Sequence, residues 1–229
     1  MQRYLNFIIP VLAAGFLYTA LAASVPAQGI LQDILKRMDD QNKSLTSLRA
    51  SVTMVKQNAQ LGDSDTTQGT AIYLPQKGRD ALVRIDWVKP DESLAVVNKE
   101  YVIYRPRLKQ AYTGSTEKAK GNGKAAGAFA FMSMSRAQLK ANYDVKYIGE
   151  ETVSSGVKTW HLQLSPKTKS NYTSAEIWID ANGFPVQSKV NEVSGDATTI
   201  LLSNLEKNIS IDGGKFKIVL PKGTSIIKS

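Results

Sequence analysis

Two kinds of side chain that carry much of protein chemistry are almost missing from this sequence of 229 residues. It has no cysteine, which excludes disulfide bonds, a thiol nucleophile, thiolate zinc sites and a lipid attached to an N-terminal cysteine. It has one histidine, His161, which is too few for a histidine-rich metal site. A domain of about 200 residues can bury enough apolar surface to fold without disulfides, so a stable fold is still expected.

Sequence motifs for catalysis are absent as well. His161 alternates with Trp160 and Leu162 in a strand-like run, so we expect it on the solvent side of a strand. Gly121-Asn122-Gly123-Lys124 lacks the earlier glycine and the following Ser or Thr of a phosphate-binding loop. No Gly-x-Ser-x-Gly motif occurs either. We therefore expect no enzyme, no cofactor and no metal site.

The acidic residues do not suggest a catalytic pair. Asp91-Glu92 and Glu150-Glu151 are neighbours in sequence, and neighbouring side chains of a strand point to opposite faces. Asp63-Ser64-Asp65 is too short for a calcium-binding loop. We expect these carboxylates at turns and strand edges, where they keep the surface soluble.

The N-terminus has the three regions of a secretory signal peptide. Arg3 precedes an apolar run over residues 7–23, and small residues then offer cleavage after Ala22 or Ala27. The run is short for the roughly 20 residues that span a bilayer, although an uncleaved anchor is the alternative. The sequence predicts a Sec-type signal peptide over residues 1–27 and export to the periplasm.

Positive charge is in excess, with 29 Lys and Arg against 20 Asp and Glu. A basic exported domain can meet anionic membranes or acidic partners, and export argues against nucleic acid. The alternative is that the lysines only keep the protein soluble. The cations concentrate at Lys77, Arg79, Arg84, Lys89, Arg105, Arg107, Lys109, Lys118, Lys120 and Lys124.

Residues 79–110 are the most informative stretch. Three runs there alternate apolar and polar residues, and short breaks at Pro90 and at Asn98-Lys99 separate them. A two-residue period with short breaks predicts an antiparallel meander of strands. Similar runs fill most of residues 48–110 and 143–207, with turns predicted at Gly62 to Asp65, Pro75 to Asp80 and Asn182-Gly183.

Two segments predict helices. Residues 30–41 place Ile30, Leu31, Ile34, Leu35 and Met38 on one helical face. Residues 128–143, after a segment rich in Lys, Gly and Ala, predict one or two short helices. The chain thus predicts a single mainly β domain over residues 28–229: one highly curved antiparallel sheet of ten or eleven strands, whose concave face the helices cover.

The 79–110 stretch resembles the outer-membrane lipoprotein carrier family, the LolA-like proteins. The shared pattern reads Arg79, then Val83 to Trp87, Lys89-Pro90-Asp91-Glu92-Ser93, Asn98-Lys99, Tyr104 and Gln110. The order of helix, strands, helical insertion and strands also fits the family. This chain departs from the family pattern at Asp80, at Ile85 and at Asn98-Lys99.

The resemblance implies a half-open barrel of about eleven strands with a helical lid. Arg79 holds the position of a family arginine that latches the lid, although the neighbouring Asp80 could bind it instead. Acyl chains of a lipoprotein, or another lipid, would lie in an apolar cavity under the helices. We expect that cavity to be lined by Val83, Ile85, Trp87, Ala95, Val97, Phe129, Phe131, Met132, Met134, Trp160, Leu162, Leu164, Ile177 and Ile179.

As a carrier, the protein would take its cargo from an inner-membrane release complex to an outer-membrane receptor, as a monomer that touches membranes transiently. Three alternatives remain. The same fold could be a sensor or regulatory domain that binds mislocalised lipoprotein or an envelope-stress partner, but we expect no second domain here. The receptor sister family needs a lipidated cysteine, and a hydrolase would need more than His161. The segment from Phe129 to Met134 could also be a plain helix that covers the core.

Overall fold

The computed structural model describes residues 27–76, 79–115 and 134–228 of the chain. Residues 1–26 of the predicted signal peptide and the predicted cavity residues Phe129, Phe131 and Met132 lie outside the described residues. The elements within these ranges, in chain order, are α1 (Ala27–Ser44), β1 (Leu48–Asn58), β2 (Asp63–Gln76), β3 (Arg79–Trp87), β4 (Glu92–Val97), β5 (Glu100–Arg105), η1 (Pro106–Leu108), β6 (Gln110–Ser115), α3 (Arg136–Asn142), β7 (Tyr143–Thr152), β8 (Lys158–Pro166), β9 (Tyr172–Asp180), β10 (Pro185–Glu192), β11 (Ala197–Lys207), η4 (Gly213–Phe216) and β12 (Ser225–Lys228).

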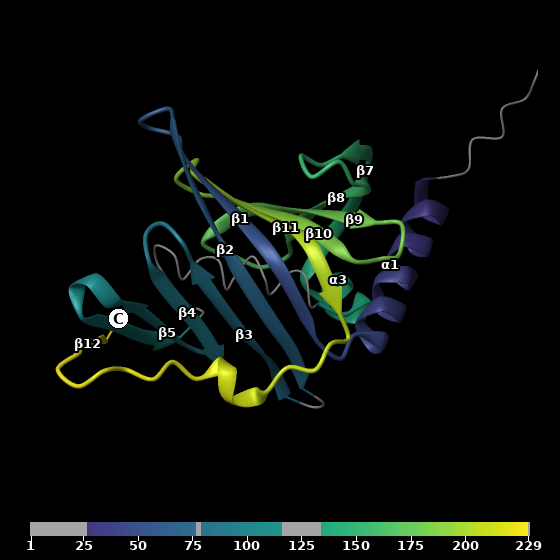
Figure 1. The fold of residues 1–229 in the computed structure, drawn as a ribbon. Helices are drawn as coiled ribbons and strands as arrows, with labels where there is room; N and C mark the ends of the chain where they lie inside the picture. The colour runs from purple at the N-terminus through teal and green to yellow at the C-terminus, as the bar shows by residue number, and fades with distance from the viewer. Residues whose placement is uncertain (1–26, 77–78, 116–133, 229) are drawn as a thin grey trace, which may run out of the picture.

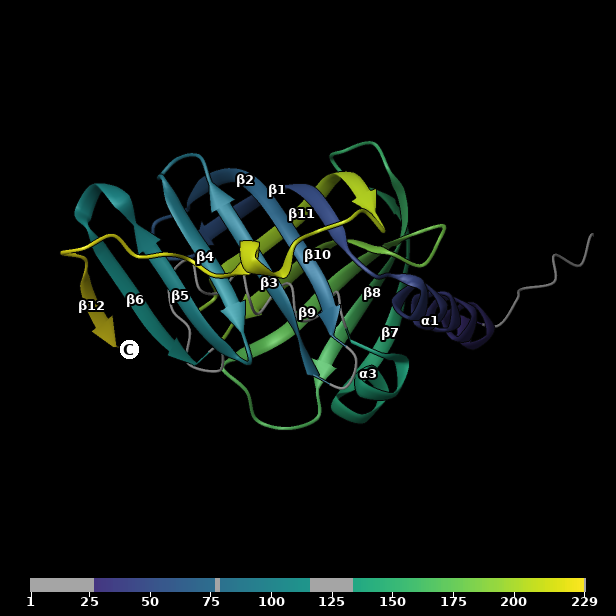
Figure 2. The same cartoon turned by 60° about the horizontal axis from the view of Figure 1, so that its bottom comes forward.

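The strands form one curved, unclosed sheet (Figures 1 and 2). Their order across this 12-stranded sheet is β12-β6-β5-β4-β3-β2-β1-β11-β10-β9-β8-β7. Every neighbouring pair is antiparallel except β12 and β6, which run parallel. The predicted fold, mainly β with helices over the concave face of a curved antiparallel sheet, is confirmed, with more strands than the ten or eleven expected.

The alternation in β1 explains both why it is a strand and which way it faces. Leu48, Ala50, Val52 and Met54 are at most 3% exposed, whereas the residues between them are partly exposed. Side chains two residues apart on a strand share a face, so these four point to the same side of the sheet. We call this concave side the inner face and the other side the outer face.

Strand register carries the inner face from β1 to β5. Ala50 pairs with Ala71 of β2, which pairs with Ile85 of β3. The row continues through Leu94 of β4 to Ile103 of β5. All five are almost completely buried. This half of the inner face is therefore an apolar floor.

The same face continues from β1 to β8 in the other direction. Met54 pairs with Ile200 of β11, which pairs with Ser188 of β10. Ser188 pairs with Ile177 of β9, and Ile177 pairs with Leu162 of β8. The two halves of the sheet, far apart in sequence, thus share one inner face through β1.

Helices α1 and α3 cover the inner face at the β7–β9 end of the sheet. Ile34, Leu35 and Met38 of α1 are buried, as the predicted stripe requires, and Leu139 of α3 joins them. They form one apolar cluster with the strand residues Tyr143, Leu162, Leu164, Ala175, Ile177 and Ile179. Burial of this stripe holds α1 against the sheet.

A capping box fixes the start of α3. The Ser135 hydroxyl accepts a hydrogen bond from the Gln138 backbone N–H, and the Gln138 side chain accepts one from the Ser135 N–H. These bonds satisfy amide donors that the first helical turn leaves unpaired. A helix of only seven residues depends on such a cap.

The predicted turns fall close to their expected places. Asn98 and Lys99 have φ of 51° and 63°, the left-handed backbone of a tight hairpin, and Gly183 has φ of 85°. The first hairpin is shifted, because Asn58 pairs with Asp63: the turn is residues 59–62, so of the predicted turn only Gly62 belongs to it, and Asp63 to Asp65 lie in β2. The chain also runs as strand nearly through the turn predicted at Pro75 to Asp80.

The chain after β11 crosses the outer face before it reaches β12, as the yellow segment in Figure 2 shows. Phe216 in η4 is 1% exposed, and Arg84 Nη1 of β3 donates a hydrogen bond to the Lys215 carbonyl at 2.9 Å. This segment therefore covers part of β3 and β4 from outside and leaves the inner face to the helices.

Candidate functional site

The inner face is the candidate site, and most described residues of the predicted lining lie on it. Val83, Ile85 and Trp87 follow the alternation of β3 and are at most 7% exposed. The other members are Leu162, Leu164, Ile177 and Ile179, fully buried against the helices, and Trp160, which is partly buried and pairs with Ile179. Strand register thus brings the two predicted groups onto one surface.

Two members of the predicted lining need correction. Ala95 pairs with Arg84, and Val97 pairs with Glu100, so both lie on the outer face. The apolar inner-face residues of β4 are Leu94 and Val96. The face of a short apolar run such as Leu94 to Val97 is ambiguous in sequence, because apolar residues occupy both phases of the alternation.

Two further predicted residues, Met134 and Arg79, lie within the described part of the chain. Met134 precedes Ser135, the N-cap of α3, and packs, partly buried, against the cluster under the helices. Arg79 is the first residue of β3. Its latch role stays a prediction that follows from the resemblance.

A pocket of about 440 Å³ opens between the helices and the start of the β2–β3 hairpin. Tyr73 and Ala81 contribute from the inner face, and Asp80 lies beside them. Its other lining residues are Asp39, Asn42, Lys43, Pro75, Gln76, Ser135 and Gln138. The helices and the strands therefore do not fill the space between them where β2 ends and β3 begins.

Helices α1 and α3 are joined to each other by polar contacts. The Asp39 carboxylate accepts a hydrogen bond from the Arg136 backbone N–H at 2.8 Å, and Asn42 Nδ2 donates to the Met134 carbonyl at 3.1 Å. Gln32 Oε1 accepts from Lys140 Nζ at 2.8 Å. Because these bonds run between the helices rather than to the strands, the two helices form one unit beside the pocket.

An ion pair between Glu92 and Arg105 interrupts the apolar inner face. It lies at the end of the sheet where the β3–β4 and β5–β6 hairpins turn. Glu92 is 0% exposed and accepts a hydrogen bond from Arg105 Nε at 2.6 Å. This bond raises the pKa of Arg105 above its ordinary value, and the guanidinium also lies 5.0 Å from the Tyr112 ring centroid. Trp87 of β3 pairs with Glu92 across the hairpin. Its Nε1 is buried and has no hydrogen-bond partner among the described residues.

Sequence reasoning missed this pair. It assigned Glu92 to a soluble turn because Pro90 and Asp91 precede it. The alternation of side chains along β4 could have predicted the burial of Glu92, because Glu92 is two residues before Leu94 and therefore shares its face. A carboxylate in that phase needs a partner, and Arg105 lies opposite it on β5.

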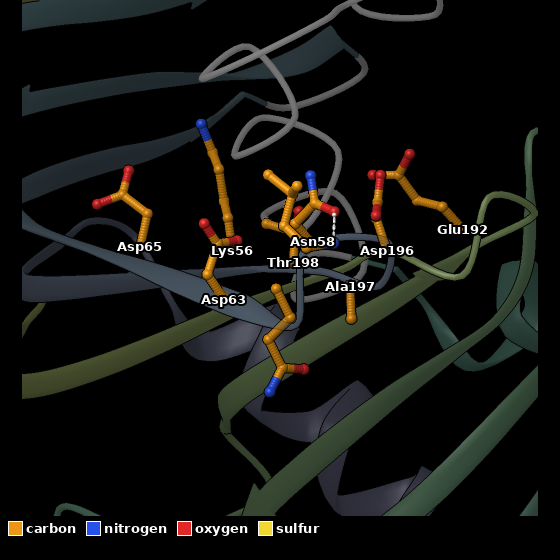
Figure 3. Close-up of a pocket in the computed structure, with 10 residues that line it drawn as sticks. Lys56, Asn58, Asp63, Asp65, Glu192, Asp196, Ala197 and Thr198 are labelled. Atoms are coloured by element: carbon orange, nitrogen blue, oxygen red, sulfur yellow. Dashed lines mark hydrogen bonds between the residues drawn. The ribbon is translucent and has the colours of Figure 1, made fainter.

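A second pocket, of about 280 Å³, lies at the tips of the β1–β2 and β10–β11 hairpins. Figure 3 shows its carboxylates, from Asp63, Asp65, Glu192 and Asp196, beside Lys56. The pocket is therefore acidic, unlike the rest of this basic chain. Within the described ranges, no group of three or more His, Asp or Glu side chains is arranged to hold a metal ion.

His161 lies on the face opposite Leu162, as predicted, but it is not a simple surface residue. Its ring stacks on Trp178 with centroids 4.3 Å apart, and Nε2 lies 2.8 Å from Glu176 Oε2. Trp178 Nε1 donates a hydrogen bond to Glu151 at 2.7 Å. The sequence placed Glu151 among the soluble edge residues, whereas the structure gives it a buried indole as partner.

None of the helices in the described part of the chain is both long enough and apolar enough to cross a membrane.

Comparison with known proteins gives one family. Residues 44–219 match the family described as "Outer membrane lipoprotein carrier protein LolA". No curated protein sequence matches the chain significantly. The match begins at the end of α1 and ends after η4, so it includes every strand except β12.

Two solved structures show the same fold at low sequence identity, and a third is similar at a lower score. An uncharacterized conserved protein from Thermus thermophilus has a TM-score of 0.53 at 16% identity, covering 87% of this chain and 99% of that chain. MucB has a TM-score of 0.52 at 15% identity, covering 83% of this chain and 63% of that chain. A putative outer membrane lipoprotein-sorting protein domain from Vibrio parahaemolyticus has a TM-score of 0.48 at 15% identity, with coverage of 80% and 94%.

Proposed function

The chain belongs to the outer membrane lipoprotein carrier (LolA) family, and we propose that it binds the acyl chains of lipoproteins, or a related amphiphile, on the inner face of its sheet. In this proposal it is a binding protein rather than an enzyme. Residues 1–27 are a signal peptide that is removed on export, and residues 28–229 are a single domain in the periplasm. The domain carries its cargo from the inner to the outer membrane.

The proposal answers a physical problem. A lipoprotein anchor exposes tens of methylene groups, and each costs about 0.8 kcal/mol in water. The total of tens of kcal/mol forbids spontaneous crossing of an aqueous compartment. A soluble carrier therefore needs a large apolar surface that is shielded from water and can be opened.

The continuous inner face is the observation that supports the proposal most. Its rows from Ile103 to Ala50 and from Met54 to Leu162 are apolar apart from Ser188. The α1–α3 unit covers one end of it, and the pocket of about 440 Å³ lies between that unit and the strands. Separation of the helices from the end of β2 and the start of β3 would admit an acyl chain without dismantling the sheet.

The partners follow from the direction of transport. We propose an inner-membrane release complex as the donor of the cargo and an outer-membrane receptor as its acceptor, with transient contact at each membrane. Because the proposed carrier is not an enzyme and spends no fuel, transfer runs toward the receptor with the higher affinity.

The first test is identification of the bound material. The protein is purified from a Gram-negative periplasm without detergent, and its organic extract is analysed by mass spectrometry. We expect acylated lipid or lipoprotein at near-stoichiometric amounts, and added protein should release lipoprotein from spheroplasts. An extract without any hydrophobic compound, together with no release, would contradict the proposal.

The second test blocks the pocket beside the helices. Ala81 lines the pocket from the inner face of β3, so the larger side chain of Ala81→Trp should fill much of it. Because the indole would occupy the space through which an acyl chain enters, uptake of a fluorescent fatty acid should fall at least tenfold. Ala137→Trp, on the exposed side of α3, is the control and should take up the probe normally. Equal uptake by both variants would show that cargo enters elsewhere.

The third test concerns the latch. We expect Arg79→Leu to stay loaded but to deliver cargo slowly to acceptor membranes. Asp80→Ala should have the opposite effect if the neighbouring carboxylate competes for Arg79. Normal delivery by Arg79→Leu, measured as lipoprotein transferred per minute, would remove the latch from the proposal.

A further inference from the structure

Two hairpin tips lie next to each other at one end of the sheet. The pair Trp87–Glu92 closes the β3–β4 hairpin, and the pair Arg105–Gln110 closes the β5–β6 hairpin. Strands β4 and β5 are themselves paired, so residues 88–91 and 106–109 project from neighbouring strands. Figures 1 and 2 both place these tips side by side, away from α1.

Each tip carries an exposed aliphatic side chain. Val88 is 68% exposed and Leu108 is 59% exposed, although both follow strands with buried residues. Single exposed aliphatics are common on protein surfaces, but two on adjacent tips make a small protruding apolar surface.

Cations surround these two side chains. Lys89 follows Val88, and Arg107 and Lys109 flank Leu108, all of them exposed. Lys222 lies close by, because the Ser225 backbone N–H donates to the Lys109 carbonyl at 2.9 Å. None of these four cations forms an ion pair with another described residue, and Asp91 is the exposed acid nearest in sequence.

The tips are also held rigidly. The buried Glu92–Arg105 ion pair lies at the base of both hairpins. The Lys109 N–H donates to the Pro106 carbonyl at 3.1 Å, and Lys109 has a left-handed φ of 49°. The backbone that carries Leu108 and its flanking cations is therefore held in one conformation, which lowers the backbone entropy lost on binding.

From these observations we propose that the two tips dock on the surface of a membrane that contains anionic phospholipid, with Val88 and Leu108 entering the acyl boundary and the cations contacting phosphate groups. Aliphatic residues at the apex with cations just behind them match the depth order of hydrocarbon and head group in a bilayer. A protein groove would require the apolar and charged groups to be satisfied from several directions, which protruding tips do not favour. The proposal deepens the proposed function, because it names the surface that meets the membrane.

The acidic hairpin tips provide a contrast within the same molecule. Leu61 is 75% exposed and Val193 is 68% exposed, so they match Leu108 and Val88 in size and exposure. They lie on the hairpins that carry Asp63, Asp65, Glu192 and Asp196. The same aliphatic groups beside carboxylates should not bind an anionic surface.

The experiment uses delipidated mature protein and empty vesicles, so it does not depend on cargo. Binding is measured by flotation with vesicles of phosphatidylethanolamine and phosphatidylglycerol, and with phosphatidylcholine vesicles for comparison, at low and at high salt. We expect binding to the anionic vesicles that weakens with salt, and little binding to phosphatidylcholine.

Matched variants then test the assignment. Val88→Ser with Leu108→Ser should weaken binding about a hundredfold, since each buried aliphatic group contributes about tenfold. Arg107→Gln should weaken it roughly fivefold, the effect of one cation near an anionic surface. The control, Leu61→Ser with Val193→Ser, should bind as the unchanged protein does. All variants change exposed residues, and circular dichroism checks that each is folded.

Each possible result supports or overturns the membrane-docking proposal. Equal binding to both vesicle types, or an equal loss of vesicle binding in the tip variant and the control, overturns it. So does normal vesicle binding by a tip variant that fails to take lipoprotein from inner membranes, because the tips would then dock on a protein. Normal acyl-chain binding by a tip variant that no longer floats with vesicles would support the proposal and leave the proposed function intact.

Discussion

Glu92 shows how a single residue can invert its expected role. In sequence it follows Pro90 and Asp91 in a polar break between two strands, and in the structure it is the 0%-exposed partner of Arg105. A buried carboxylate is tolerated only when it is paired, since desolvation of the charge is otherwise too costly. The pair therefore fixes the neighbouring hairpins β3–β4 and β5–β6 relative to each other.

We predict that Glu92→Gln lowers the free energy of unfolding by about 2 kcal/mol, the usual worth of a hydrogen bond to a charged group. The control is Glu206→Gln, because Glu206 pairs with Arg49 at an exposed site, with side chains 53% and 40% exposed. An exposed pair contributes less than about 1 kcal/mol. Urea unfolding followed by tryptophan fluorescence measures both, and equal effects would show that burial of Glu92 does not matter for stability.

At the scale of elements, the position of α1 depends on the β9–β10 turn. A Cβ atom on Gly183 would collide with the backbone carbonyl of Arg37 in α1, so only glycine allows this approach. Arg37 also donates from Nη1 to the Ala181 carbonyl at 3.3 Å and lies over the Trp160 ring, 5.5 Å from its centroid. The β9–β10 turn therefore packs against α1 as well as connecting two strands.

We predict that Gly183→Ala destabilises the fold by about 3 kcal/mol, since it adds displacement of α1 to the cost of a left-handed backbone. Gly156→Ala separates the two effects. Gly156 has nearly the same φ, +82° against +85°, but nothing lies within 4 Å of its Cβ position. It should cost only about 1 kcal/mol. Thermal unfolding measures both, and equal losses would mean that α1 is not held by this contact.

At the scale of the whole molecule, the unclosed sheet has two edges, β7 and β12. The four-residue β12 pairs with residues 110–113 of the six-residue β6, and it reaches β6 because the chain crosses the outer face through η4. An open strand edge is a template for pairing with another chain. We therefore expect the C-terminal segment to protect β6 from pairing with another chain.

We predict that deletion of residues 221–229 turns a monomer into a mixture of dimers and larger species, because it exposes the N–H and C=O groups of β6. Light scattering coupled to size-exclusion chromatography measures the mass. Ile226→Thr with Ile227→Thr is the control, since it keeps the strand but removes its exposed aliphatic groups. A monomeric deletion protein would refute the protective role, and an oligomeric control would assign association to other causes.

Local patterns in the sequence determined much of this protein. The stripe Ile34, Leu35 and Met38 predicted α1, the period-two runs predicted the strands, and Asn98-Lys99 and Asn182-Gly183 predicted tight turns. These signals act between residues close in sequence, so the sequence alone carries them. The family resemblance came from the same kind of local pattern in residues 79–110 and agrees with the family match over residues 44–219.

Only the tertiary structure decided which surfaces meet. The phase of β4, which puts Leu94 inside and Ala95 outside, depends on pairing with β3, and the link between the two halves of the inner face depends on β1. The buried pair Glu92–Arg105 and the close approach of Gly183 to α1 also join residues that are distant in sequence. Such contacts are set by strand register and helix packing, where desolvation and steric exclusion act across the fold rather than along the chain.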